Sequence, residues 1–234
     1  MTPNGRSMAL TPELVALCHR EVTAGPPDPR YDNFTDADYD RAITQVLDGK
    51  PEGPFWLFAS GSLIWKPEVI HVERLKAIAK GWHRAFSMRI EAYRGTPEQP
   101  GYMMCLDRGG HCEGVILRLP EDDQIAQLNR LLKREVGSHE QLESARWIEV
   151  ETSEGPVMAL TFYAHPRLLD YYQEGRPQAE IVHGLARACG HWGSGAAYLH
   201  NTVSHLEALG IHDEALWTLQ EMVAAEIIAI HGKR

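Results

Sequence analysis

The chain has 234 residues, of which 44% are hydrophobic and 24% are charged, and its formal net charge is −9 at pH 7. This balance is typical of a globular protein with a sizeable core, and it excludes the basic surface on which nucleic-acid binding depends. No stretch of about 18 apolar residues occurs, so the sequence predicts neither a membrane span nor a membrane partner.

Helices are predicted close to the start of the chain. Thr11 followed by Pro12 is a typical helix start, and Thr35 followed by Asp36 and Asp38 is a second one. The Pro/Gly cluster GKPEGP then separates this part from the rest. We therefore expect residues 1–53 to form an N-terminal helical extension and residues 54–234 to form one domain.

Strands are predicted to dominate the region after this cluster. FWLFA and GVILRL are short apolar runs bounded by Gly and Pro, and GWHRAFSMRI and GYMMCLD are rich in aromatic and apolar residues. RWIEVET and VMALTFYAH, on either side of Ser153-Glu154-Gly155, predict a hairpin. A closed or partly closed sheet would leave no exposed edges.

Helices are predicted again after Pro120 and from Gln178 onward. The apolar stripe of the first is formed by four residues, Ile125, Leu128, Leu131 and Leu132. In the tail, Gly190 and Gly210 fit helix C-terminal caps. Because strands and helices are segregated along the chain, the predicted class is α+β rather than alternating α/β.

Cysteine usage and the first residues bear on the compartment. The cysteines Cys18, Cys105, Cys112 and Cys189 are widely spread and form no CxxC motif, which predicts reduced thiols. MTPNGRSMAL contains no apolar stretch of the kind that a secretory signal carries. We therefore expect a cytoplasmic protein.

Common catalytic signatures are missing from the sequence. There is no P-loop, GxGxxG, GxSxG or HExxH motif. Twelve histidines are scattered without the spacing of convergent ligands, so we expect no metal site.

Two features point to chemistry. The first is the hinge Ser60-Gly61-Ser62-Leu63 at the end of an apolar run, where main-chain N–H groups can face a carboxylate or an oxyanion. On composition alone, a strand exit or a β-bulge is the simpler explanation of this hinge. The second is Glu135 at a helix C-terminus, where a carboxylate is disfavoured by about 0.3–1 kcal/mol. A solvated glutamate paired with Arg134 would explain that position too.

Four segments, taken in order, resemble the ChaC group of γ-glutamylcyclotransferases over residues 55–228: FASGSLIWKP, GWHRAFSMRIEAYRGTPEQPGYMMCLDRGGHCEGVILRLP, LLKRE and ACGHWGSGAAYLHNTVSHLEALGI. The resemblance implies a γ-glutamylcyclotransferase-like fold, a small mixed β-barrel flanked by helices. The implied reaction is cofactor-independent cleavage of glutathione into 5-oxoproline and cysteinylglycine. In it the substrate's α-amine attacks its own γ-carbonyl.

The resemblance also implies the site residues. It places the catalytic glutamate on Glu135, as the base that takes the proton of the amine. The implied substrate-binding residues are Ala59, Ser60, Gly61, Ser62, Leu63, Ile64, Arg94 and Tyr198. Two of these have ordinary explanations as well, since Arg94 can brace a turn and Tyr198 can be a core residue.

Ser60 departs from the family pattern, because the family has a tyrosine at this place before Gly-Ser-Leu. Two alternatives to a glutathione-specific enzyme therefore stay open. One is a degenerate member that binds a γ-glutamyl ligand without turnover, and the other is a cyclotransferase for another γ-glutamyl compound. The expected partner is a small molecule in each case.

Overall fold

The computed structural model describes residues 6–26, 33–165, 172–173 and 175–232. The chain divides into two compact units. The barrel unit comprises residues 27–85 and 105–170, and the helical unit comprises residues 1–26, 86–104 and 171–234. None of the helices in the described ranges is both long and apolar enough to cross a membrane.

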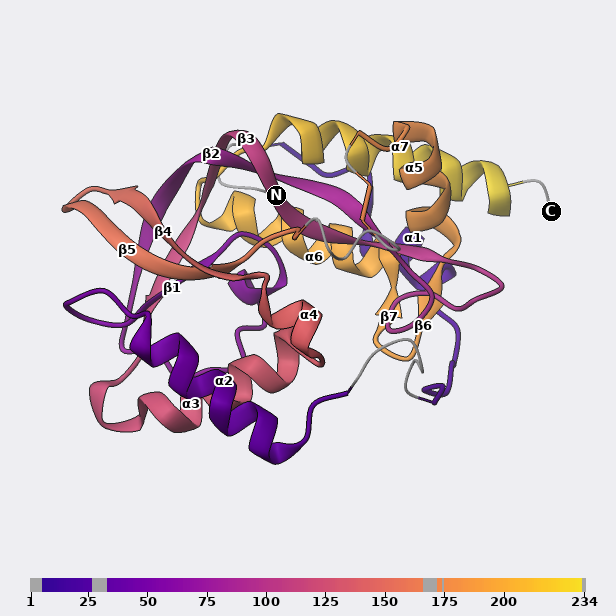
Figure 1. Ribbon diagram of the computed structural model, residues 1–234. Coiled ribbons are helices and arrows are strands. Elements are labelled where there is room, and N and C mark those ends of the chain that lie inside the picture. The colour runs from indigo at the N-terminus through magenta and orange to yellow at the C-terminus, as the bar shows by residue number, and fades with distance from the viewer. Residues whose placement is uncertain (1–5, 27–32, 166–171, 174, 233–234) are drawn as a thin grey trace. The chain divides into compact units, whose positions relative to one another are not determined.

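Five strands close into a barrel in the order β1-β3-β2-β4-β5 (Figure 1). They are β1 (Trp56–Ala59), β2 (Glu73–Ile90), β3 (Gly101–Arg118), β4 (Ala145–Thr152) and β5 (Gly155–Phe162). β1 runs parallel to β5 and antiparallel to β3, while β4 pairs antiparallel with both β2 and β5. This mixed, closed sheet confirms the α+β class, the barrel and the hairpin around residues 153–155.

Strands β2 and β3 are longer than the sequence pattern indicated, at 18 residues each. GYMMCLD and GVILRL, which read as separate apolar runs, both belong to β3. Gly109 and Gly110 lie between them with φ of +100° and +68°. Glycine adopts positive φ without a steric penalty, so the strand continues through a segment whose composition suggested a break.

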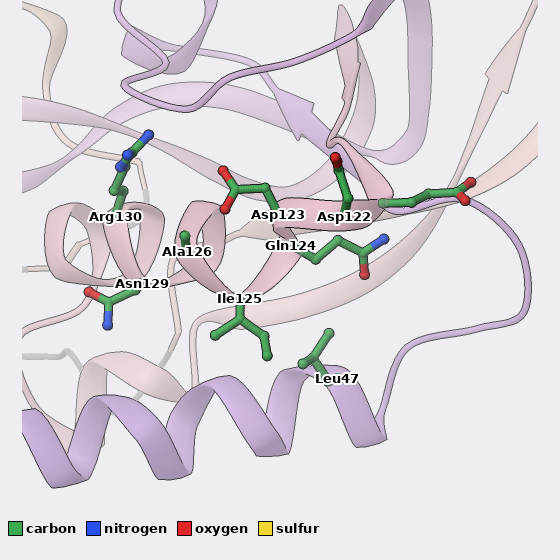
Figure 2. A pocket seen from close by; sticks show the side chains of 9 residues that line it. Leu47, Asp122, Asp123, Gln124, Ile125, Ala126, Asn129 and Arg130 are labelled. Carbon is green, nitrogen blue, oxygen red and sulfur yellow. The ribbon is translucent and has the colours of Figure 1, made fainter.

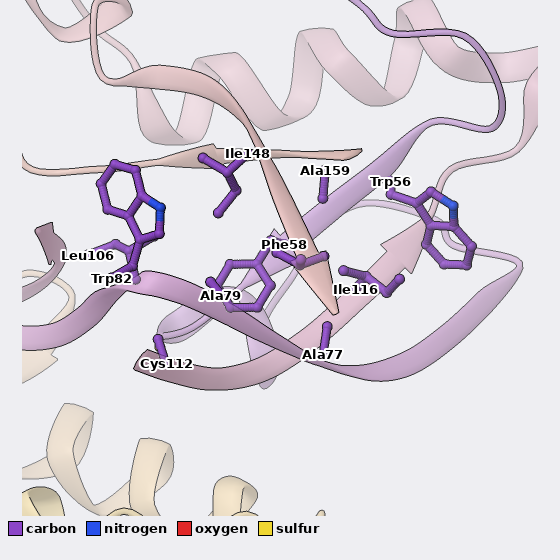
Figure 3. Close-up of a cluster of buried hydrophobic side chains, with 11 residues drawn as sticks. Trp56, Phe58, Ala77, Ala79, Trp82, Leu106, Cys112, Ile116, Ile148 and Ala159 are labelled. Carbon is purple, nitrogen blue, oxygen red and sulfur yellow. The ribbon is translucent and has the colours of Figure 1, made fainter. Parts of the chain in front are cut away.

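Alternate residues of the strands fill the barrel interior (Figure 3). Trp56 and Phe58 of β1, Ala77 and Ala79 of β2, and Ile148 and Val150 of β4 show the period of two that places side chains on one face of a sheet. The cluster comprises Trp56, Phe58, Ala77, Ala79, Trp82, Leu106, Cys112, Ile116, Ile148, Val150 and Ala159.

The described residues of the barrel unit also form the helices α2 (Asp36–Asp48), α3 (Gln124–Glu135) and α4 (His139–Leu142). Helix α2 begins after Thr35, as predicted, and Thr35 caps it through a capping box with Asp38. A short 3-10 helix, η2 (Glu121–Asp123), leads into α3, which packs against α2.

The predicted stripe of α3 is confirmed at Leu128, Leu131 and Leu132, which are fully buried. It is wrong at Ile125, which is 65% exposed. Ile125 lies in the first turn of the helix and lines a hollow beside Leu47 of α2, as Figure 2 shows.

The helical unit contains α1 (Pro12–Leu17), α5 (Gln178–Arg187), α6 (Gly195–Ala208), α7 (Glu214–His231) and a small hairpin of β6 (Cys189–Gly190) and β7 (Gly193–Ser194). Gly210 follows the end of α6 with φ of +68°, as expected for a cap. The prediction that Gly190 caps a helix is wrong, because α5 ends at Arg187 with Ala188 as its C-cap, and Gly190 belongs to β6. A Cβ atom at Gly190 would lie 2.2 Å from the main-chain oxygen of Tyr93, so close packing requires the glycine.

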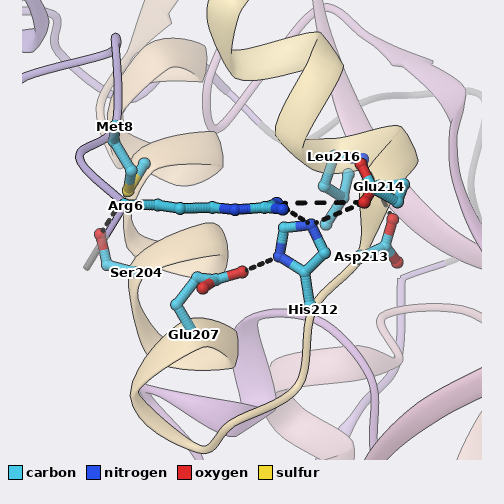
Figure 4. Close-up of polar contacts among 8 residues, drawn as sticks. All are labelled: Arg6, Met8, Ser204, Glu207, His212, Asp213, Glu214 and Leu216. Carbon is cyan, nitrogen blue, oxygen red and sulfur yellow. Dashed lines mark hydrogen bonds and ion pairs between the residues drawn. The ribbon is translucent and has the colours of Figure 1, made fainter. Parts of the chain in front are cut away.

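The N-terminal segment packs on α6 and α7 (Figure 4). Arg6 contacts the ring of His212 at 2.9 Å, and the ring's Nδ1 contacts the carboxylate of Glu207. Leu10 is fully buried, and its main-chain N–H donates to Oε1 of Gln220 at 2.8 Å. Residues 33–53, by contrast, belong to the barrel unit. The expected domain boundary at residue 53 would separate segments that fold independently. It stays a prediction.

Candidate active site

The chain leaves the barrel where the hinge was expected. Strand β1 ends at Ala59, and Ser60 and Gly61 lead into a 3-10 helix, η1 (Ser62–Ile64). The feature is therefore a strand exit. The side chains of Ala59, Leu63 and Ile64 are buried, so these residues can meet a ligand through their main chain.

Three consecutive amides at this exit find no acceptor among the residues that the structure describes. Within the described ranges, the main-chain N–H groups of Gly61, Ser62 and Leu63 donate no hydrogen bond. The first amides of a helix lack an acceptor within it, whereas the N–H of Ile64 already donates to the oxygen of Gly61 at 3.0 Å. Neighbouring main-chain N–H groups of this kind can bind a carboxylate or an oxyanion.

A buried arginine fixes the strand exit. Arg84 of β2 is 8% exposed, its Nε donates to the main-chain oxygen of Ser60 at 3.0 Å, and an Nη donates to the main-chain oxygen of Glu113. Our sequence analysis missed this residue. The available signal was a charged side chain within the otherwise apolar run GWHRAF.

Glu135 lies at the last position of α3, and Arg134 connects it to the strand exit. The Nε of Arg134 donates to Oε1 of Glu135 at 2.8 Å, and an Nη of the same guanidinium donates to Oγ of Ser62 at 2.8 Å. Another Nη donates to the main-chain oxygen of Lys66. The structure thus brings together Glu135 and the hinge, which are 73 positions apart when counted from Ser62 (135 − 62).

The environment of Glu135 suits a base. Its side chain is 23% exposed, and burial raises the pKa of its carboxyl above the usual range. The charge and hydrogen bond of Arg134 oppose this rise in pKa, and the nearby Glu68 adds to it. A general base works best when its pKa lies nearer to neutrality than that of a solvated carboxylate.

A second polar contact holds the segment that follows η1. The side chain of Gln127 in α3 is fully buried, and its Oε1 accepts from the main-chain N–H of Ile70 at 2.7 Å. Helix α3 therefore holds residues 62–70 at two places, through Arg134 and through Gln127. Sequence reasoning missed Gln127, which is a buried polar residue within a leucine stripe.

Arg94 and Tyr198 are brought together within the helical unit. The guanidinium carbon of Arg94 lies 5.1 Å from the ring centroid of Tyr198, and an Nη of Arg94 donates to the main-chain oxygen of Ser194 at 3.2 Å. Tyr198 is 3% exposed, and its ring meets Phe86 edge-on at 5.9 Å. Both are well-anchored residues of this unit, whereas Glu135 and residues 59–64 belong to the barrel unit.

The hollow in Figure 2 has a volume of about 750 Å³ and lies around the N-terminal part of α3. It contains none of the predicted site residues. Its lining residues are Leu47, Glu121, Asp122, Asp123, Gln124, Ile125, Ala126, Asn129 and Arg130.

Comparisons with known proteins agree with the sequence motifs. The family model described as ChaC-like protein matches residues 55–226. The glutathione-specific γ-glutamylcyclotransferase of Escherichia coli K12 is 39% identical over 166 residues, which cover 70% of this chain and 71% of that protein. γ-Glutamylcyclotransferase 2-3 of Arabidopsis thaliana is 29% identical over 175 residues, which cover 72% and 87%.

A solved structure shows the same fold. The yeast γ-glutamylcyclotransferase specific to glutathione superposes with a TM-score of 0.64 at 19% identity, covering 74% of this chain and 97% of that one. This likeness confirms the expected γ-glutamylcyclotransferase-like fold. The family model matches well over half of the chain, and the E. coli relative is aligned over more than two thirds of its length. The chain therefore belongs to the ChaC-like family, together with the γ-glutamylcyclotransferases that it matches in sequence.

Proposed function

We propose that the protein is a glutathione-specific γ-glutamylcyclotransferase that converts glutathione into 5-oxoproline and cysteinylglycine. One observation carries this proposal: Arg134 donates hydrogen bonds both to the partly buried Glu135 and to Ser62. Ser62 lies among the three amides, of residues 61–63, that find no acceptor in the described part of the chain. The 39% identity to an E. coli enzyme named for this specificity supports glutathione as the substrate.

Glu135 is the proposed base. The α-amino group of glutathione is mostly protonated at pH 7 and cannot attack until it loses a proton. The carboxylate of Glu135 accepts a hydrogen bond from Arg134 on Oε1, while Oε2 accepts none within the described part of the chain. Oε2 is therefore the atom that we assign to the amine of the substrate.

Ring closure is intramolecular. The free amine attacks the γ-carbonyl carbon, a new C–N bond closes a five-membered lactam, and the bond to the cysteinyl nitrogen breaks. The proton held by Glu135 passes to that leaving nitrogen, so neither water nor a cofactor enters the balance. Because attack within one molecule needs mainly the correct conformation, the protein's main task is to fold the substrate.

The strand exit is the proposed anion-binding element. The N–H groups of Gly61, Ser62 and Leu63 would stabilise the oxygen of the tetrahedral intermediate or hold the α-carboxylate of the glutamyl group. Main-chain donors do not depend on side-chain identity, so Ser60 in place of the family tyrosine leaves them unchanged. We assign supporting roles in substrate binding to Ala59, Ile64, Arg94 and Tyr198.

The proposed reaction also bears on the partner and the cellular location of the protein. Glutathione is the small-molecule partner, and no nucleic acid or membrane takes part. The widely spread cysteines of the chain are typical of a reducing compartment, which supports a cytoplasmic location.

The decisive experiment incubates the purified protein with glutathione and identifies the products by mass. Equal amounts of 5-oxoproline and cysteinylglycine are expected, and Glu135→Gln should abolish both while leaving the circular dichroism spectrum unchanged. Glu121→Gln, the same change at an exposed position of η2, is the matched control and should retain activity. Full turnover by Glu135→Gln would contradict the proposed mechanism.

Two further experiments distinguish cyclisation from hydrolysis. In H₂¹⁸O, cyclisation incorporates no label, whereas hydrolysis would give labelled glutamate. Glutathione acetylated on its α-amine should not be cleaved. A panel of other γ-glutamyl compounds then tests specificity, because faster turnover of one of them would replace glutathione as the assigned substrate.

A further inference from the structure

One guanidinium group contacts both parts of the candidate site. Arg134 reaches Glu135 on its own helix, and it reaches Ser62 and Lys66 on the segment that leaves β1. Its side chain is 12% exposed. One of its nitrogens also lies 3.8 Å from Oε2 of Glu68.

A local ion pair does not account for this arrangement. Pairing of two adjacent side chains at a helix end explains the contact from Nε to Glu135, and nothing more. The contacts to Ser62 and Lys66 connect positions that are 72 and 68 residues away in the chain. They use the planar fork of a guanidinium, whose N–H groups point in fixed directions that an ammonium group does not reproduce.

We propose that Arg134 is a positioning residue for the cyclisation, because it fixes the carboxylate of Glu135 relative to the amides of Gly61, Ser62 and Leu63. This inference rests on the proposed function. Through its Nε, Arg134 occupies Oε1 of Glu135 and leaves Oε2 for the amine of the substrate. Through Ser62 and Lys66, it holds the first turn of η1, from which the amides project.

The same contact affects protonation. Burial and Glu68 both favour the neutral form of Glu135, and Arg134 is the group that favours the carboxylate. Lys66, on the same segment as Glu68, is paired with Glu68 at 3.0 Å, and Ser62 presents a neutral hydroxyl. Removing the charge of Arg134 therefore moves protonation of the base to higher pH.

The test separates geometry from charge with two variants. Arg134→Gln removes both, and we expect kcat to fall on the order of 100-fold, as expected for a displaced catalytic group. The acid limb of its pH–kcat profile should move up by about one pH unit. Arg134→Lys keeps the charge without the fork, so its acid limb should stay in place while its kcat stays low.

Two further variants control the experiment. Arg130→Gln, on an exposed position one turn earlier in α3, should leave kcat and the pH profile unchanged. Ser62→Ala removes one contact of the guanidinium and should lower kcat several-fold in the wild-type background. It should add nothing to Arg134→Gln, because residues that act through one contact are not additive.

The outcomes are distinguishable. If the wild type forms no 5-oxoproline, the proposed function fails and this inference fails with it. If the wild type is active but Arg134→Gln keeps kcat within threefold, or loses kcat with an unmoved acid limb, the inference alone is overturned. Should Arg134→Gln fail to fold, Arg134→Lys and Ser62→Ala decide, and wild-type kcat in both would overturn it.

Discussion

The Nε atom of Arg84 lies 3.0 Å from the main-chain oxygen of Ser60, and this hydrogen bond ties the end of β1 to β2. It acts on the main chain of a residue whose side chain departs from the family pattern. The strand exit is therefore held in place regardless of which side chain position 60 carries.

Replacing Arg84 should destabilise the barrel unit and impair the exit. Arg84→Met would leave the main-chain oxygens of Ser60 and Glu113 without this donor, and hydrogen bonds from a charged group are worth about 1.5–3 kcal/mol each. We expect the free energy of unfolding in urea to fall by at least about 2 kcal/mol, with a lower kcat. Arg74→Met, on an exposed position of the same strand, is the control, and an equal loss in both variants would refute a specific role for Arg84.

Glu135→Gln should change how stability depends on pH. Burial raises the pKa of Glu135, so the folded protein retains a proton that the unfolded chain releases near pH 4.3, the usual pKa of Glu. The wild type therefore loses stability as pH rises from about 4.3 to the raised pKa, with a slope of up to about 1.4 kcal/mol per pH unit. Urea unfolding at a series of pH values measures this loss, which Glu135→Gln should lack. Parallel stability curves for the two proteins would show that the carboxyl is not desolvated.

The dependence of kcat on pH should also report the protonation of Glu135. A protonated Glu135 cannot accept the proton of the amine, so kcat should fall as pH is lowered through the raised pKa. The measurement is the initial rate of 5-oxoproline release between pH 4 and 8. An acid limb at or below the usual pKa of Glu would point to a different base.

Two substitutions at Tyr198 distinguish the packing of its ring in the core from binding of the substrate. Its ring is buried against Phe86 and Arg94, so Tyr198→Ala should cost about 3–5 kcal/mol of stability. Tyr198→Phe keeps the ring, and its unfolding free energy should stay within about 1.5 kcal/mol of the wild type. If the hydroxyl binds substrate as we propose, this variant should raise KM about tenfold, the equivalent of one hydrogen bond. An unchanged KM would leave Tyr198 as a core residue alone.

The N-terminal segment should contribute to the stability of the helical unit. Leu10 is fully buried and lies on α7 through its hydrogen bond to Gln220. Leu10→Ala should therefore cost about 2–5 kcal/mol. Leu17→Ala in the neighbouring helix is the control, since Leu17 is 49% exposed and its loss should cost less than about 0.5 kcal/mol. Equal effects in thermal unfolding would contradict a role specific to the buried leucine.

Local patterns explain the parts that could be predicted. The helix starts at Thr11 and Thr35 depend on side chains that accept a hydrogen bond from the amide three positions further on. The hairpin of β4 and β5 depends on a two-residue turn between alternating strands. Glu135 and the hinge were identified because the ordered motifs resemble a family. Each of these signals is contained in a short stretch of sequence or in the order of such stretches.

Contacts between distant positions explain what could not be predicted. Gly190 looked like a helix cap, but packing against the main chain of Tyr93 is what requires a glycine there. The contacts of Arg84 with Ser60 and of Arg134 with Ser62 exist because the barrel closes and α3 packs beside the strand exit. The raised pKa of Glu135 follows from burial. Residue types and their order were enough to indicate the fold and to suggest Glu135 as the base, whereas the position of Glu135 relative to the amides, and its proton affinity, come from long-range packing.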